Sequence, residues 1–136
     1  MTTSESETPT QGTTAASGPV TLTVPPIASM VRVGRLTASS IASLSDMTID
    51  DIDDIKIAVS EMITLLIQSG SRANVTLRFE TTSSSFTIEA TTPATSLDLG
   101  RNDLALATAV LDAVSDSHEV AFIDDRILMR MVKAIA

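Results

Sequence analysis

The chain has 136 residues, of which 43% are hydrophobic, so it is long enough for one domain with a substantial core. It has no cysteine and a single histidine, which excludes disulfides, thiolate metal sites and cysteine nucleophiles and argues against a Ser-His-Asp triad. Its net charge of −8 argues against general affinity for nucleic acids or anionic membranes, because both depend on clustered lysine and arginine. An acidic protein of this kind is better suited to a partner with a basic surface.

Residues 1–18 are rich in serine, threonine, glutamate and glycine and offer almost nothing to bury. We therefore expect a disordered tail, followed by one domain over residues 19–136. The N-terminus has neither the charged nor the apolar region of a signal peptide, and no apolar run approaches the roughly 18 residues of a membrane span. The expectation is a cytoplasmic protein without a membrane segment.

Residues 20–24 (VTLTV) alternate and are rich in β-branched side chains, which predicts a strand that the following two prolines end. Residues 27–44 then change to a helical period, with apolar side chains at steps of three and four. The predicted buried face of this helix consists of Met30, Val33, Leu36 or Thr37, Ser40 or Ile41, and Leu44. Arg32 and Arg35 fall elsewhere on its surface.

The most strongly amphipathic segment, residues 50–70, predicts one long helix against which the rest of the chain must pack. Its apolar face consists of Ile52, Ile55, Val59, Met62 and Leu66. Thr48 and Asp51 have the spacing of a capping box at its start, and Gly70 is placed to end it. The acidic residues at 50–54 indicate a helix start favoured by the helix dipole, rather than a cation site.

The second half of the chain begins with two alternating runs, residues 74–80 and 85–90, that predict a β-hairpin. Residues 91–102 contain a proline and a glycine and have no strong period, which predicts a loop. Residues 103–114 predict a third helix. Its apolar residues in helical register are Leu104, Ala107 or Thr108, and Leu111.

The chain continues with a predicted strand at 118–123, where His118 is expected at the surface. Residues 126–135 fit a helix, and they equally fit a strand after a tight turn at 124–125, so periodicity leaves both open. The order of elements predicts an α+β fold, a two-layer α/β sandwich with a mixed, mostly antiparallel sheet and helices on one face. The other face of the sheet is then solvated or used in association.

The long helix also carries a resemblance to a known family. The segment around Ile52 to Leu66 (DIDDIKIAVSEMIT) is similar to the D-[IL]-K-[IL]-A-V-[ST]-E-x-x-T-N signature of bacterial anti-sigma regulatory factors. These are serine kinases related to the histidine-kinase and Hsp90-type ATPases. LTVP at 22–25, VRVGRLTASSIAS at 31–43 and the hairpin also match, so the resemblance covers roughly residues 20–136. It implies the histidine-kinase-like ATPase fold, which ends in a strand.

The same resemblance implies where a nucleotide site would lie. In that family the helix glutamate is the general base and an asparagine one turn later ligates Mg²⁺; Glu61 matches the glutamate, and Leu65 stands at the asparagine position. A pair spaced by four shares one helix face, so Leu65 is expected to point at the nucleotide site, where leucine offers Mg²⁺ no oxygen. Thr91 or Thr92 replaces the aspartate that reads adenine, and the accompanying glycines are absent. We therefore expect neither ATP nor Mg²⁺ to bind, and Glu61 to be a vestigial base or a solvated helix carboxylate.

The partner-binding residues that the resemblance implies lie in the first helix. In the family, the arginine of an R-[LVI]-T run contacts protein partners, and Arg35-Leu36-Thr37 matches this run. Arg35, with Arg32 one turn earlier, is therefore a candidate for partner binding, although it could equally be an ordinary exposed arginine. The resemblance implies a degenerate regulatory protein that binds a sigma factor, a STAS-type anti-anti-sigma factor or both, and that forms a homodimer. The alternatives are an active ATP-dependent serine kinase that phosphorylates the anti-anti-sigma factor, and a scaffold subunit of a signalling complex.

Overall fold

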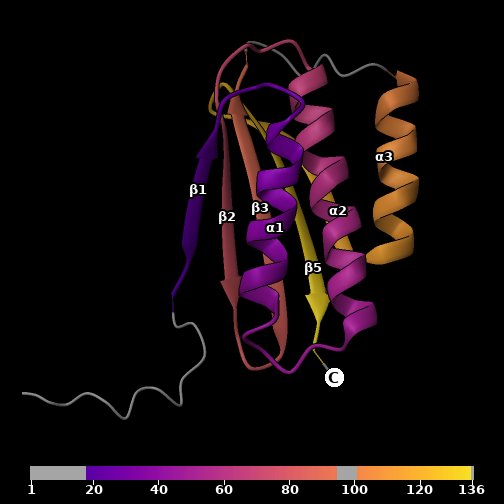
Figure 1. The fold of residues 1–136 in the computed structure, drawn as a ribbon. Helices are drawn as coiled ribbons and strands as arrows, with labels where there is room; N and C mark the ends of the chain where they lie inside the picture. Colours follow the sequence, from indigo (N-terminus) through magenta and orange to yellow (C-terminus); the bar gives the residue numbers. More distant parts are fainter. Residues whose placement is uncertain (1–17, 95–100, 136) are drawn as a thin grey trace, which may run out of the picture.

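The computed structural model describes residues 18–94 and 101–135, so the tail expected at 1–18 lies outside the described residues apart from Gly18. The elements, in chain order, are β1 Val20–Val24, α1 Met30–Ala42, α2 Ile49–Gln68, β2 Val75–Thr81, β3 Ser85–Pro93, α3 Arg101–Val114, β4 Ser117–Ile123 and β5 Arg126–Ala134. All three helices cover one face of the sheet (Figure 1). The predicted α+β fold, with two layers and helices on one side, is confirmed.

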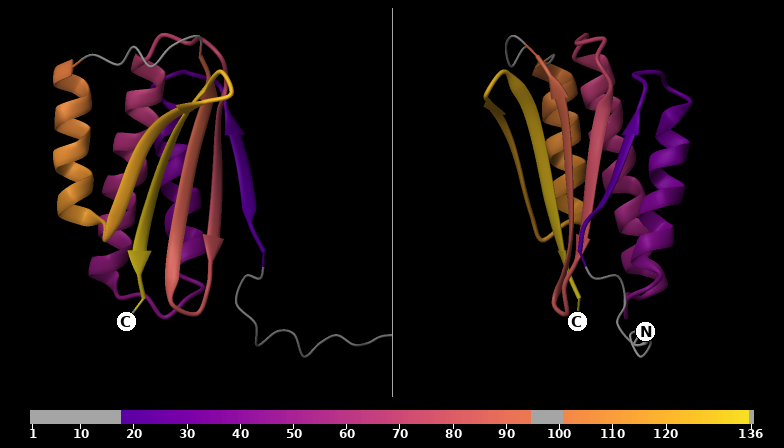
Figure 2. Two further views of the ribbon diagram at one scale, coloured as in Figure 1. Left: turned by 180° about the vertical axis from the view of Figure 1, so that it is seen from behind. Right: turned by 90° about the vertical axis from the view of Figure 1, so that its left-hand side faces the viewer.

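The sheet has the strand order β1-β2-β3-β5-β4, and each of these four pairings is antiparallel. Within the described residues the sheet is therefore antiparallel throughout rather than mixed. The ambiguous C-terminal segment is a strand, β5, because it pairs with β3 on one side and β4 on the other. Asp124 and Asp125 have φ angles of 53° and 58°, which a two-residue type I′ hairpin turn requires. No helix covers the opposite face of the sheet in the described part of the chain (Figure 2).

Helix α2 lies in the middle of the helical layer, between α1 and α3 (Figure 1). The predicted capping box is present: Thr48 Oγ1 accepts a hydrogen bond from the Asp51 amide at 3.1 Å, and the Asp51 carboxylate accepts one from the Thr48 amide at 3.4 Å. Gly70, with φ of 77°, follows the helix end as predicted. The buried residues of the helix are Ile55, Ala58, Val59, Met62, Ile63, Leu65 and Leu66.

The buried face predicted for α1 is only partly right, because Ile41 is buried and Met30 packs against the core but other predicted members are exposed. The residues that α1 buries are Gly34, Ala38, Ile41 and Ala42. Val33 and Leu44, expected on this face, are 37% and 61% exposed, and Leu36, expected there as an alternative to Thr37, is 56% exposed. The physical reason is close approach: a Cβ added to Gly34 would lie 2.2 Å from Cδ1 of Ile63 on α2. The packing face of α1 is therefore made mainly of small side chains together with Ile41, while Val33 and Leu36 remain on the outside.

Two predictions for the second half of the chain are also wrong. The loop expected from residue 91 starts later, because β3 continues through Thr91 and Thr92 and ends at Pro93, where a proline is tolerated. His118, expected at the surface, is only partly exposed, with 16% of its side chain accessible, and its imidazole is hydrogen-bonded to the carboxylate of Asp112 on α3. The predicted third helix is confirmed over Arg101–Val114, with Ala107, Leu111 and Val114 buried.

An ionic contact joins the two layers where α2 begins. The ammonium of Lys133, on β5, lies 2.8 Å from Asp54 Oδ2 and 3.8 Å from Asp51 Oδ1. Burial of Lys133 disfavours its charged form, but the hydrogen bond to Asp54 and the surrounding carboxylates outweigh this effect, so the pKa of Lys133 is raised. The acidic start of α2 is therefore partly neutralised from the sheet, in addition to the favourable helix dipole.

Candidate functional site

Glu61 lies on the outer side of α2, where it is partly exposed. It borders a surface depression of about 560 Å³. The other lining residues are Arg35 of α1 and Asp53, Lys56, Ile57 and Ser60 of α2. The residue that matches the family's general base therefore shares a surface feature with the arginine that matches the family's partner contact.

Leu65 is not on this surface. It is 2% exposed and belongs to the same buried cluster as Ala107 and Leu111 of α3. Leu65 is therefore buried in the core and does not share the exposed surface around Glu61. Two residues four positions apart on a helix differ by about 40° beyond one full turn. Glu61 lies at the border of the buried face, and this extra rotation places Leu65 inside it. That face is wide because α2 is covered on both flanks.

The two threonines at the family's adenine-reading position take different roles. Thr92 is fully buried on the helix side of β3, and its hydroxyl lies 3.1 Å from the Asn74 carbonyl, to which it donates, and 2.9 Å from Ser71 Oγ. Thr91 faces the opposite side of the sheet, where its hydroxyl accepts a hydrogen bond from Arg126 Nη2 at 2.9 Å. The Thr92 hydroxyl therefore ties β3 to the segment that precedes β2.

These residues can be compared with what a magnesium–nucleotide centre needs. Mg²⁺ takes oxygen ligands in near-octahedral geometry, and the buried Leu65 side chain has none to offer. Thr92 donates its only hydroxyl proton to the backbone carbonyl of Asn74. Within residues 18–94 and 101–135, no group of three or more acidic, histidine or cysteine side chains could hold a metal ion. The described residues at these positions do not fit the centre that the signature implies.

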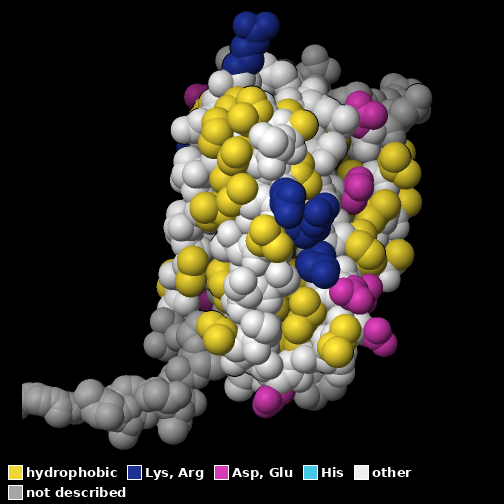
Figure 3. All heavy atoms as spheres, viewed as in Figure 1, with side chains coloured by type: hydrophobic (Ala, Val, Ile, Leu, Met, Phe, Trp, Pro, Cys, Tyr) yellow, Lys and Arg dark blue, Asp and Glu magenta, His cyan; other side chains and the backbone are white. Residues whose placement is uncertain are grey.

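Arg32 and Arg35, the two predicted partner-binding residues, are exposed and lie one turn apart on α1. Neither forms an ion pair with any described residue. Figure 3 shows lysine and arginine side chains gathered in the middle of the face formed by α1 and α2, with apolar side chains beside them. Leu36, next to Arg35, is 56% exposed, and Ile57 of α2 is 46% exposed.

The sequence reasoning missed Lys56 and Ile57 as members of this face. A signal was present, because Ile57 is a large aliphatic residue out of phase with the apolar stripe of Ile55 and Val59. Together, the six residues Arg32, Arg35, Leu36, Lys56, Ile57 and Glu61 are called the α1–α2 surface below. It combines cations, aliphatic side chains and the carboxylate of Glu61, all at least partly exposed.

No protein-family model and no curated protein matches the chain. Among solved structures, the chain is similar to the crystal structure of the RsbU and RsbW domains of Rv1364c from Mycobacterium tuberculosis, with a TM-score of 0.67 and 13% sequence identity. The chain shares this fold. The similarity covers 88% of this chain and 34% of that chain, so the protein spans about a third of the length of its structural neighbour. No helix in the described ranges is long and apolar enough to cross a membrane.

Proposed function

We propose that this protein is an anti-sigma-factor-like regulatory module that binds a sigma factor, a STAS-type anti-anti-sigma factor or both, and that has lost nucleotide chemistry. Two independent likenesses support the binding role. The sequence resembles anti-sigma regulatory factors around Glu61, and the fold is shared with a structure that contains an RsbW domain. Arg32 and Arg35 are exposed and have no ion-pair partner among the described residues, so they supply groups suited to bidentate capture of partner carboxylates.

The burial of Leu65 is the observation that best supports the proposed loss of nucleotide chemistry. At the position where the family has a metal ligand, this chain has an aliphatic side chain that is 2% exposed. Burial of such a side chain contributes about 1.5–3 kcal/mol to folding. A polar ligand in the same place would leave a buried amide or carboxylate unpaired, at a cost of about 1–3 kcal/mol or more. A metal site there would require the core around Leu65 to be rebuilt.

One observation favours the alternative, an active ATP-dependent serine kinase. Glu61 is retained and remains accessible to solvent, as a general base would need to be. The kinase alternative predicts transfer of the γ-phosphate from ATP to a serine of the STAS-type partner, and loss of that transfer in Glu61→Gln. Our proposal predicts no transfer to a panel of STAS proteins from the source organism.

The partner class is tested by direct binding. The purified full chain should form a stable complex with one of the organism's alternative sigma factors or STAS proteins in size-exclusion chromatography, with or without ATP. Capture of other signalling proteins, with neither of these classes among them, would contradict the proposal and favour a scaffold subunit.

A homodimer is part of the same proposal. The uncovered sheet face carries a row of charges in which Arg78 lies 3.1 Å from Glu80, and Arg130 lies 3.4 Å from Glu89. Such pairs at a solvent-facing surface contribute little to the stability of the monomer, which leaves them available for an interface. Light scattering of the full chain should give the mass of a dimer. A monomer at all accessible concentrations would contradict this part of the proposal.

A further inference from the structure

We propose that the free edge of β4 is a docking site for an extended, basic segment of a protein partner, which adds to the five-stranded sheet as one further strand. This edge is separate from the α1–α2 surface, because β1 and β4 are the opposite edges of the sheet and α1 packs on β2, next to β1. The inference goes beyond the proposed function, since strand addition requires neither a nucleotide nor a sigma factor or STAS protein.

The backbone of β4 is paired on one side only. In the described part of the chain, β5 is its single neighbour in the sheet, so the amide and carbonyl groups along its other side have no strand partner there. Figure 2 shows β4 as the outermost strand, beside the yellow β5. A row of unpaired backbone groups of this kind is a template for a further strand.

The two edges of the sheet differ in how well they are protected against such pairing. β1 has five residues and lies between Pro19 and the pair Pro25 and Pro26, which limit the length available to another strand. β4 has seven residues without proline or lysine, and its register with β5 runs one-to-one without a bulge. Proline, lysine and bulges are the usual devices that protect an edge strand, so β4 is the open edge of this sheet.

The side chains of β4 supply apolar contacts for an added strand. Successive side chains of a strand point to opposite faces, and Val120 and Phe122 share the face of the sheet that the helices cover. Phe122 lies opposite the buried Ile127 of β5 yet is 37% exposed, so the described helices leave it partly uncovered. An apolar residue on an added strand would lie beside Phe122, and cross-strand pairs of this kind stabilise a sheet.

Three exposed carboxylates lie along or directly after β4. Glu119 is in the strand, and Asp124 and Asp125 follow it in the hairpin turn. None of the three forms an ion pair with any described residue. These carboxylates are therefore available to lysine or arginine side chains on an added strand.

The cations of the neighbouring strand do not offset these carboxylates at the free edge. Arg126 and Arg130 of β5 both bind groups on β3, which is the neighbour of β5 on the side away from β4. Arg126 donates to the Thr91 hydroxyl at 2.9 Å, and Arg130 lies 3.4 Å from Glu89. His118 is hydrogen-bonded to a carboxylate of α3. The edge is therefore acidic, in agreement with the net charge of −8, and it selects a basic strand.

The same charges argue against a second copy of the chain as the occupant. If two copies of β4 paired antiparallel over their whole length, Val120 would face its own counterpart and Asp116 would lie opposite Asp124 of the second copy. Like charges directly opposite each other destabilise a strand pair. Because each chain also has a net charge of −8, a basic segment of another protein is the better match.

The test uses fluorescence polarisation with a labelled peptide of about eight residues, close to the length of β4, in which valine alternates with lysine. A second peptide has glutamate in place of each lysine, and a third has proline in place of the two central valines. The valine–lysine peptide should bind the full chain. The other two should bind at least about tenfold more weakly, because one reverses the charge and the other lacks amide donors for the backbone pairing.

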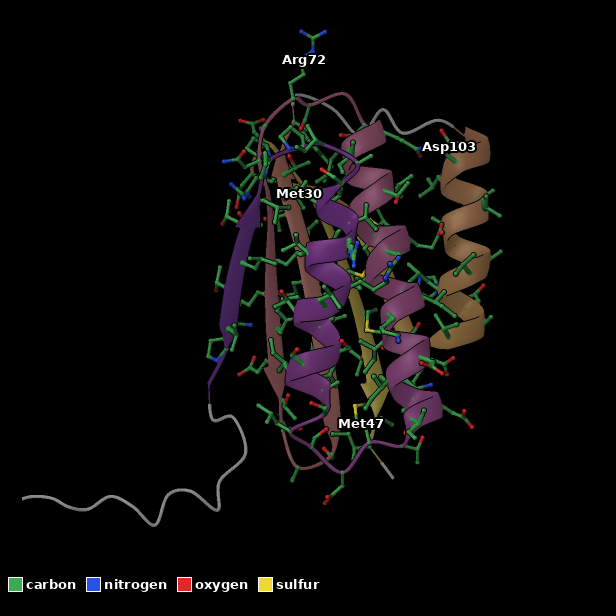
Figure 4. All side chains as sticks on the ribbon, viewed as in Figure 1. Met30, Met47, Arg72 and Asp103 are labelled. Atoms are coloured by element: carbon green, nitrogen blue, oxygen red, sulfur yellow. The ribbon has the colours of Figure 1, made fainter. Side chains whose placement is uncertain are left out.

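Two conservative variants test the role of charge. Glu119→Gln and Asp125→Asn should each weaken binding of the valine–lysine peptide about two- to fivefold. Asparagine tolerates the positive φ of position 125, so the turn is retained. Asp46→Asn is the matched control, because it removes one carboxylate charge from an exposed position in the connection between α1 and α2, next to the labelled Met47 (Figure 4). This variant should bind the peptide as the unmodified chain does.

Amide hydrogen exchange locates the bound peptide. The amides of residues 117–123 should exchange more slowly in the complex, and those of residues 20–24 should not change. The inference is overturned if the valine–lysine peptide does not bind, if the proline peptide binds as tightly, if Asp46→Asn loses as much affinity as Asp125→Asn, or if the protection appears on β1 instead. A dimer of the free chain that the peptide dissociates would assign the edge to a second copy and also overturn it.

Discussion

The contact between Gly34 of α1 and Ile63 of α2 permits a quantitative test of how the two helices pack. In Gly34→Ala, the new Cβ would lie 2.2 Å from Ile63 Cδ1, while the next atom, Cδ1 of Leu77, is at an ordinary 3.4 Å. Ile63 is fully buried, so moving its Cδ1 to another rotamer should cost about 1–3 kcal/mol. The substitution also gains about 1 kcal/mol of helix propensity. Gly34→Ala alone should therefore lower the free energy of unfolding by up to about 2 kcal/mol.

The effect of Gly34→Ala on the free energy of unfolding should reverse its sign when Ile63 is shortened. Ile63→Val removes the Cδ1 atom and costs about 0.5–1.5 kcal/mol by itself. In that background the remaining neighbours of the new Cβ lie at 3.4 Å or beyond, so Gly34→Ala should stabilise by about 0.5–1 kcal/mol. The two substitutions are thus coupled by about 1–3 kcal/mol, a size expected only for residues in direct contact.

Urea unfolding gives the free energy of unfolding of the unmodified chain, Gly34→Ala, Ile63→Val and the double variant. Far-UV circular dichroism follows the transition, because the chain has no tryptophan or tyrosine for fluorescence. Ser40→Ala, at an exposed position of α1, is the control for helix propensity. It should stabilise the chain by about 0.5 kcal/mol both with isoleucine and with valine at position 63. If Gly34→Ala has the same effect with isoleucine and with valine at position 63, the close approach of α1 to α2 is refuted.

Two further substitutions test contacts that hold the layers together. Lys133→Met should lower the free energy of unfolding by about 1–3 kcal/mol at neutral pH, because it leaves the partly buried Asp54 without its cation. The pKa of Lys133 is raised in the folded state, so its contribution to stability is present below the usual value of 10.5 and is lost as pH rises through the folded pKa. The free energies of unfolding of Lys133→Met and of the unmodified chain should therefore converge at alkaline pH. Thr92→Val should cost about 1–2 kcal/mol by removing the hydrogen bonds of the Thr92 hydroxyl with the Asn74 carbonyl and Ser71, whereas Thr91→Val, on the partly exposed face, should change the urea midpoint little. Equal effects would contradict the assigned roles.

The features that the sequence predicted correctly depend on local patterns. The period of residues 50–70 and the Thr48–Asp51 spacing are sufficient to define α2 and its start, because capping involves only neighbouring residues. The hairpin of β2 and β3 follows in the same way from two alternating runs. The C-terminal segment could not be decided locally, since its period suits both structures, and pairing with the distant β3 makes it a strand.

The errors arise where long-range packing overrides local hydrophobicity. On α1 the size of the side chains suggested a core face of Val33 and Leu36, but the fit against Ile63 demands Gly34 and Ala38 there. The burial of Leu65 depends on how the rest of the core packs around α2, which no pattern within α2 records. For the candidate site, the sequence therefore identified Arg32, Arg35 and Glu61 as exposed polar groups, but could not place Leu65.

The central claim is that this fold binds proteins and no longer binds a nucleotide. Isothermal titration calorimetry of the full chain with Mg-ATP tests it most directly. We expect no saturable heat up to millimolar nucleotide, with or without Mg²⁺, because the metal-ligand position is occupied by the buried Leu65. Saturable binding in the micromolar range that depends on Mg²⁺ would contradict the account and restore the kinase alternative.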